Sequence, residues 1–116
     1  MRMLRYAKAL LAIAVFGAMV APAQNYRGRI QGLVTDQTKA VIANARVTLS
    51  NTATGIQVVR LSSDTGLFLF DLVDAGTYIV AVEAAGFNKF VQENVVVQAR
   101  GDVTVDATMT PGAVQE

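Results

Sequence analysis

The sequence predicts an all-β fold: a seven-stranded antiparallel β-sandwich forming one domain. Three observations lead to this prediction. Apolar and polar residues alternate along short segments, turn-forming residues recur about every eight to twelve positions, and no segment beyond the N-terminal stretch keeps an apolar period of 3.6. Alternation indicates strands with one buried and one solvated face, which is typical of antiparallel sheets. Two packed sheets bury many such strands.

The clearest strand signal runs from Asp102 to Thr110, where the apolar residues occupy every second position. Residues 45–49 and 77–84 show the same alternation. The strands are expected at 29–35, 45–50, 56–62, 67–72, 77–84, 87–91 together with 94–98, and 103–109.

The turns between these strands contain residues with a reason to reverse the chain. The run from Asn51 to Gly55 combines an Asn that can bond its own backbone with a Gly that tolerates positive φ. It predicts the reversal between the second and third strands. The following reversals are predicted at Asp64-Thr65-Gly66, Asp74-Ala75-Gly76 and Ala85-Gly86.

The composition permits a packed core and excludes much enzymology. Of 116 residues, 53% are hydrophobic and 16% charged, so one domain with a sizeable core is expected. Histidine and cysteine are both absent. This removes the side chains used for most proton transfer at neutral pH, thiolate attack and transition-metal binding. The acidic residues fall at turns or on wet faces, and no Asp-x-Asp-x-Asp calcium loop occurs. We expect no catalysis, no cofactor and no metal.

Residues 1–23 have the pattern of a signal peptide. Basic residues precede an uncharged run of 13 residues from Ala9 to Ala21, and Ala21-Pro22-Ala23 offers small residues for cleavage after Ala23. A membrane-spanning helix needs about 20 residues, so an uncleaved anchor is the weaker alternative. The protein is therefore expected to be exported to the periplasm, the outer membrane or the medium, with no transmembrane span after cleavage.

The apparent basicity of the chain belongs to this leader. Its removal takes away three of the ten basic groups and leaves seven against nine acidic groups, a net charge of −2. A mildly acidic body without a basic cluster argues against nucleic-acid binding.

Two stretches carry a recognisable pattern. Gly66, Phe68, Phe70, Val73, Gly76, Tyr78, Val80 and Val82 follow the spacing G-x-Y-x-F-x-x-L-x-x-G-x-Y-x-V-x-V, and Gly32-Leu33-Val34-Thr35-Asp36 precedes them. The pattern resembles the carboxypeptidase regulatory-like domain family. It divides the chain into the signal peptide at 1–23, a short lead at 24–28, the sandwich at 29–110 and a tail at 111–116.

The resemblance implies a transthyretin-like Greek-key sandwich that acts as an accessory domain without peptidase activity. A signal followed by such a domain is similar to the N-terminal extension of TonB-dependent outer-membrane receptors, and Thr110–Glu116 is similar to the linker before a receptor plug. The expected partner is an outer-membrane receptor or another envelope protein. A stand-alone product and part of a longer chain are both compatible with the sequence.

Two positions depart from the family pattern. Lys39 stands where the family usually has Gly, and a non-Gly residue at positive φ costs about 1 kcal/mol, so this turn is expected to be rearranged. Asn44 also replaces Gly, but Asn tolerates the left-handed conformation, so that turn is expected to survive.

The alternative function is a carbohydrate- or small-ligand-binding module. Tryptophan is absent, and with Phe68, Phe70 and Tyr78 in the core, Tyr26, Phe87 and Phe90 remain for stacking on a sugar. Packing at a sandwich edge is the competing explanation for Phe87 and Phe90. A hydrolase is the third and weakest alternative.

Leu67 and Leu69 alternate with the core phenylalanines, so they point away from the core. They are predicted either to lie under a loop or a chain end, or to form a docking patch for a partner or a second copy.

Overall fold

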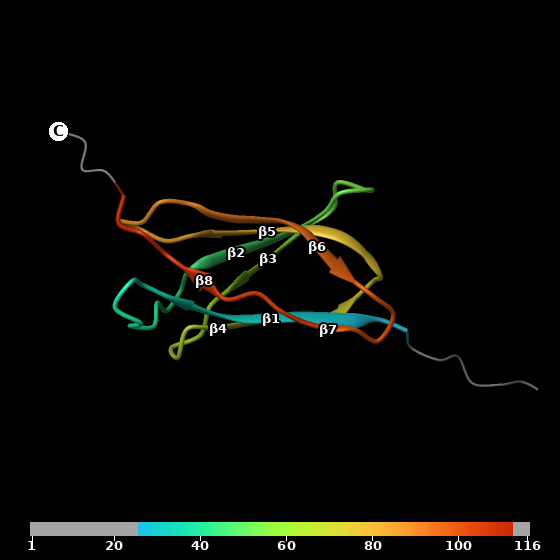
Figure 1. Cartoon of the computed structure of the whole chain (residues 1–116), viewed down its shortest axis with the longest axis horizontal. Helices are drawn as coiled ribbons and strands as arrows, with labels where there is room; N and C mark the ends of the chain where they lie inside the picture. The colour runs from blue at the N-terminus through green and yellow to red at the C-terminus, as the bar shows by residue number, and fades with distance from the viewer. Residues whose placement is uncertain (1–25, 113–116) are drawn as a thin grey trace, which may run out of the picture.

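The computed structural model describes residues 26–112, which form two stacked β-sheets and no helix (Figure 1). The sheets have the strand orders β4-β1-β7, with β8 also on β1, and β3-β2-β5-β6. This confirms the two-sheet sandwich. The strands are β1 (Gly28–Thr35), β2 (Arg46–Asn51), β3 (Gln57–Leu61), β4 (Leu67–Val73), β5 (Gly76–Glu83), β6 (Phe90–Val97), β7 (Asp102–Thr104) and β8 (Ala107–Thr108).

The core lies between the sheets and consists of the alternate residues that the pattern predicts. Phe68 and Phe70 are 3% and 2% exposed, and their rings meet edge to face with centroids 6.1 Å apart. The Tyr78 hydroxyl donates a hydrogen bond to the Asp74 carbonyl (2.7 Å), so this buried aromatic keeps a polar partner. The other buried members include Ile30, Val34, Val47, Val80, Val82, Val97, Val105 and Met109.

The last expected strand, 103–109, is divided into β7 and β8, so the described chain has eight strands. Both pair in parallel with β1, a departure from an entirely antiparallel sandwich. The chain between them stays bonded to β1: Val105 N–H donates to Gln31 O (2.8 Å), and the Asp106 carboxylate accepts from Leu33 N–H (3.1 Å). A Cβ on Gly32 would lie 1.8 Å from Val105 O, so this close approach requires glycine.

The sixth strand is continuous, whereas two pieces at 87–91 and 94–98 were expected. β6 runs from Phe90 to Val97, and Asn94 within it has a φ of 57°. Its register with β5 shifts between Tyr78 and Val80. The irregularity is therefore absorbed as a bulge, and the strand is not broken.

The two turns that depart from the family pattern both have a non-Gly residue in the left-handed conformation. Asn44 has a φ of 58°, as expected. Lys39 has a φ of 69°, so the expectation that its turn is rearranged is wrong. The Asp36 carboxylate holds the turn by accepting bonds from the Thr38 hydroxyl (2.6 Å), Thr38 N–H (2.8 Å) and Ala40 N–H (3.0 Å). The Thr38 hydroxyl bond in particular lowers the pKa of Asp36 from its ordinary value of 3.8.

Residues 26–112 contain no helix with the length and apolar character needed to cross a bilayer. The predicted signal peptide at 1–23 lies outside the described residues.

The contact between Gly32 and Val105 gives the first prediction. Gly32→Ala should lower the free energy of unfolding by about 3 kcal/mol, because the new methyl group overlaps a backbone carbonyl that cannot move alone. Gly76→Ala is the control, since the nearest atom to its Cβ, on the Tyr78 ring, is 3.7 Å away. Urea unfolding of the exported chain measures both, and equal losses would contradict the proposed clash.

Candidate functional site

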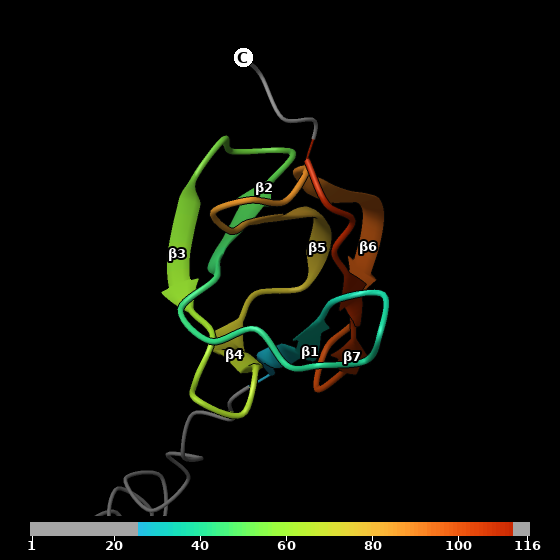
Figure 2. The ribbon, with the colours of Figure 1, turned by 90° about the vertical axis from the view of Figure 1, so that its left-hand side faces the viewer.

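Each sheet ends in two edge strands, β3 and β6 in one sheet and β4 and β7 in the other. β6 lies near β7 on one side of the sandwich, and β3 lies near β4 on the opposite side (Figure 2). Between β3 and β4 lies a groove with a cavity of about 330 Å³. We call this the β3–β4 groove; it is lined by Leu49, Asn51, Thr54, Ile56, Val58, Arg60, Phe70, Asp71, Leu72, Val73, Asp74 and Tyr78.

The groove has an apolar floor because the inward phases of several strands meet there. Leu49 of β2 and Tyr78 of β5 are buried beneath it. Val58 is half-buried at the inward phase of β3, and Ile56, just before that strand, is 65% exposed. A ligand in the groove would therefore meet aliphatic surface below and polar groups at the rim.

Arg60 is the one basic residue that lines the β3–β4 groove. It shares the inward phase with Val58, since both stand opposite core residues of β2. Its guanidinium donates to Val59 O (3.0 Å) and has no carboxylate within 4 Å among the described residues. The acids of the far wall have other contacts: Asp74 pairs with Arg27 (3.0 Å), and Asp71 accepts from Leu72 N–H (2.9 Å).

Leu72 marks a strained bulge at the groove's rim. Its φ is 54°, which costs a non-Gly residue about 1–2 kcal/mol, and its side chain is 54% exposed. The β1–β4 register shifts here: Gly28 faces Val73 and Ile30 faces Phe70, so β4 has one extra residue. Sequence reasoning missed this bulge. The signal was the spacing of three, instead of two, between the core residues Phe70 and Val73.

Leu67 and Leu69 lie on the outer face of sheet β4-β1-β7, away from the β3–β4 groove. They are 55% and 46% exposed, so no loop or chain end within residues 26–112 covers them. A shallow hollow of about 520 Å³ lies beside them, its other lining residues being Gln31, Gly32, Leu33, Ser63, Phe68, Thr104 and Asp106. The outward orientation is as predicted, and the docking role stays a prediction.

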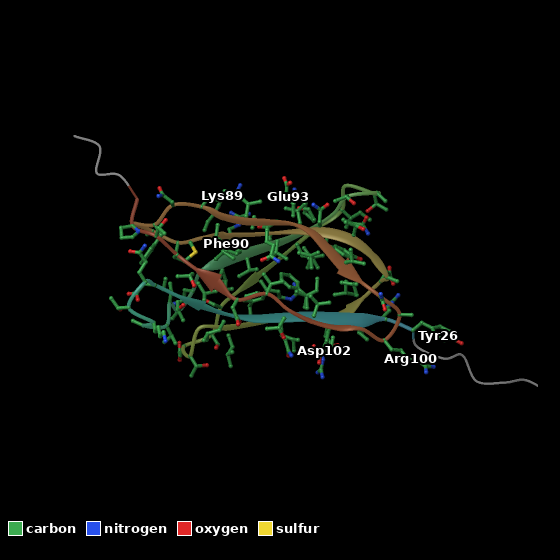
Figure 3. The ribbon with its side chains drawn as sticks, viewed as in Figure 1. Tyr26, Lys89, Phe90, Glu93, Arg100 and Asp102 are labelled. Atoms are coloured by element: carbon green, nitrogen blue, oxygen red, sulfur yellow. The ribbon has the colours of Figure 1, made fainter. Side chains whose placement is uncertain are left out.

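The three aromatic candidates do not form one platform. Phe87 and Phe90 are half-buried against the core, and Phe87 also forms a bridge with Pro111. Tyr26 lies at the opposite end of the sandwich from Phe90, with the Arg100 guanidinium 5.1 Å from its ring centre (Figure 3). Stacking of a sugar on Phe87 or Phe90 remains a prediction.

Two carboxylates, Asp71 and Asp74, both line the β3–β4 groove. Among residues 26–112 there is no group of three or more acidic side chains able to hold a metal ion. Asp102 pairs with Arg29 (3.2 Å) and Glu83 with Lys89 (3.4 Å), all on exposed surfaces. Such exposed pairs contribute little to stability.

The family model for the carboxypeptidase regulatory-like domain matches residues 29–110. The chain belongs to this family. The match covers all eight strands except the first residue of β1. No curated protein matches the chain significantly.

Solved structures share the fold of this carboxypeptidase regulatory-like domain. The TIE protein of Bacillus anthracis has a TM-score of 0.64 at 18% identity, over 74% of this chain and 17% of that one. A proposed carbohydrate-binding protein of Bacteroides uniformis has a TM-score of 0.60 at 24% identity, over 73% of this chain and 42% of that one. Catechol 1,2 dioxygenase of Acinetobacter radioresistens has a TM-score of 0.63 at 10% identity, over 78% of this chain and 53% of that one. The chain thus spans about half or less of each relative, and identities this low show the fold alone.

The strained bulge leads to a second prediction. Leu72→Gly should lower the free energy of unfolding by at least about 1 kcal/mol less than Leu69→Gly does. Only the first change also relieves the strain of a non-Gly residue held in the left-handed conformation. Leu69 is the matched control, being 46% exposed on the same strand. Thermal and urea unfolding measure the pair. Equal destabilisation would mean that the bulge stores no strain.

Proposed function

We propose that this carboxypeptidase regulatory-like domain is a non-catalytic accessory domain of an exported envelope protein, resembling the N-terminal extension of a TonB-dependent outer-membrane receptor. The family match over 29–110, the signal pattern at 1–23 and the scattered acidic residues support this proposal. The surface for a partner is the apolar strip formed by Leu67 and Leu69 or the β3–β4 groove.

The observation that carries the proposal is the position of the two ends of the domain. The described chain begins at one end of the sandwich and leaves at the other (Figure 1). At the first end, Arg100 N–H donates to Tyr26 O (2.9 Å); at the other, Gly112 N–H donates to Gly86 O (2.9 Å). A domain fastened in this way holds neighbouring segments apart in a fixed direction, which suits an accessory module.

A carbohydrate- or small-ligand-binding module is the second candidate. The β3–β4 groove favours it, since its apolar floor and polar rim suit a small amphipathic molecule. Glycan-array binding that is lost on Phe87→Ala or Phe90→Ala would favour this candidate over the first.

Export and location test the leading proposal. An epitope inserted among residues 52–54, an exposed part of the β2–β3 turn, leaves the ladders intact. Expressed from the native gene, the tagged protein is expected in the outer-membrane fraction, and deletion of residues 1–23 should retain it in the cytoplasm. A cytoplasmic product with its leader intact would refute export, and a freely periplasmic one would refute the receptor assignment.

The Leu67–Leu69 strip gives a further prediction. Leu67→Lys with Leu69→Lys should abolish cross-linking of the domain to an envelope partner in intact cells, because charges on the apolar strip oppose desolvation. Val91→Lys with Val96→Lys is the control, since these residues are 49% and 56% exposed on β6. If the cross-links and the oligomeric state survive the leucine changes, the strip is not a docking surface.

A further inference from the structure

The edge of β3 presents backbone groups that no other described strand pairs, and one of them, Val59 O, accepts a hydrogen bond from the Arg60 guanidinium (3.0 Å). Two bonds at the ends of the β2–β3 ladder fix its phase: Asn51 N–H donates to Ile56 O (2.9 Å), and Ser62 N–H donates to Ala45 O (2.9 Å). Hydrogen bonding alternates along an antiparallel ladder, so the intervening residues that bond β2 are Val58 and Arg60. The backbone groups of Gln57, Val59 and Leu61 therefore point outward, and no other strand pairs with them.

The edge of β4, across the groove, is protected. Leu67 N–H donates to the Ser63 hydroxyl (3.2 Å), and Leu67 O accepts from Ser63 N–H (2.8 Å), so the loop occupies one outward position. The bulge at Leu72 disrupts the other end of the strand. Bulges and covering loops are devices that keep edge strands from pairing. β3 has neither, and its five residues include no proline; its one charged residue, Arg60, bonds the outward Val59 O.

We propose that β3 binds an additional strand, an extended peptide segment of a partner protein that alternates apolar and acidic residues on its groove-facing side. Its main chain bonds to Gln57, Val59 and Leu61, which extends sheet β3-β2-β5-β6 by one strand. Every second side chain then enters the β3–β4 groove, where Val58 and Leu72 provide apolar contacts. The other side chains lie over the exposed outer face of Val59 and Leu61.

Arg60 determines the chemistry of this partner. It is the only charged side chain on β3, it faces the groove, and among the described residues no carboxylate lies within 4 Å of it. A residue added opposite Arg60 comes within direct side-chain reach, so a carboxylate there forms a cross-strand ion pair. The partner strand therefore carries an acidic residue at this position and an apolar one two positions away, opposite Val58.

A second copy of this chain fits the same edge poorly. In a two-fold antiparallel pairing of β3 with itself about Val59, each Arg60 stands opposite Val58 of the other copy. β3 offers no carboxylate, so both guanidinium groups would be covered without a counter-charge. This charge mismatch favours a foreign strand.

The inference deepens the proposed function by naming the partner's chemistry at the β3 edge and the β3–β4 groove. Peptide binding is measured on the purified exported chain, whereas export and location are measured in cells. A failure of one can therefore be told apart from a failure of the other.

The probe is the synthetic peptide acetyl-Thr-Val-Thr-Glu-Thr-Val-Thr-amide, titrated into the ¹⁵N-labelled exported chain. Its glutamate pairs with Arg60 when its third, fifth and seventh residues bond to Leu61, Val59 and Gln57. The amide signals of these three β3 residues should shift most. N-methylation of the third and fifth residues should weaken binding at least roughly tenfold, since it removes the bonding N–H groups. N-methylation of the fourth and sixth residues is the control and should leave binding intact.

Variants of the protein test the same geometry. Arg60→Gln should weaken binding by roughly fivefold, and replacing the peptide's glutamate by lysine should do the same or more. Val59→Pro removes an outward N–H without removing a β2–β3 bond and should abolish binding; Leu69→Pro on β4 is the control. If Val59→Pro does not fold, the comparison of the two N-methylated peptides still tests whether the peptide's main chain bonds to β3.

Three results of the peptide titrations would overturn the inference. These are no β3 shifts at millimolar peptide, equal binding of the two N-methyl isomers, or shifts confined to the outer face around Leu67 and Leu69. Peptide-independent dimerisation that Val59→Pro abolishes would overturn it in favour of self-pairing.

Discussion

The architecture depends on the pairing of the chain's last strands with its first. β7 and β8 lie in parallel beside β1, and β4 lies on the other side of β1, so β1 is the central strand of its sheet. The chain needs a long connection to reach this position, because parallel neighbours cannot be joined by a tight turn. Once β7 is placed there, it lies near β6 of the other sheet. β3 and β4 are the edge strands on the opposite side of the sandwich.

The close approach at Gly32 is the most exacting part of this pairing. Val105 is buried in the core, and its carbonyl occupies the space that a side chain on Gly32 would fill. Asp106 turns its carboxylate back to Leu33 N–H, so the interruption between β7 and β8 leaves the bond to β1 in place. The interruption thus aims one side chain into the core while the segment stays attached to β1.

Residue patterns predicted the buried phase of the strands more reliably than their irregularities. Alternation identified Tyr78, Val80 and Val82 as core residues because burial between two sheets follows directly from a period of two. The bulge at Leu72 and the parallel placement of β7 depend on which strands become neighbours, which a local pattern does not contain. Lys39 shows the same limit: the cost of its φ was predicted, but not the bonds from Thr38 and Ala40 that keep the turn.

The same reasoning explains why the candidate sites lie at edges and outer faces. The core between the sheets is filled by alternating apolar side chains, and no buried side-chain polar atom among the described residues lacks a hydrogen-bond partner. A ligand therefore finds backbone groups to bond at the edge strands, of which β3 and β4 flank the groove. At β4 a loop and a bulge reduce them, whereas at β3 the outward backbone groups have no strand partner, and Arg60, which bonds Val59 O, has no carboxylate within 4 Å among the described residues. The pairing of β7 and β8 with β1 thus leaves β4 as the edge that faces β3 across the groove.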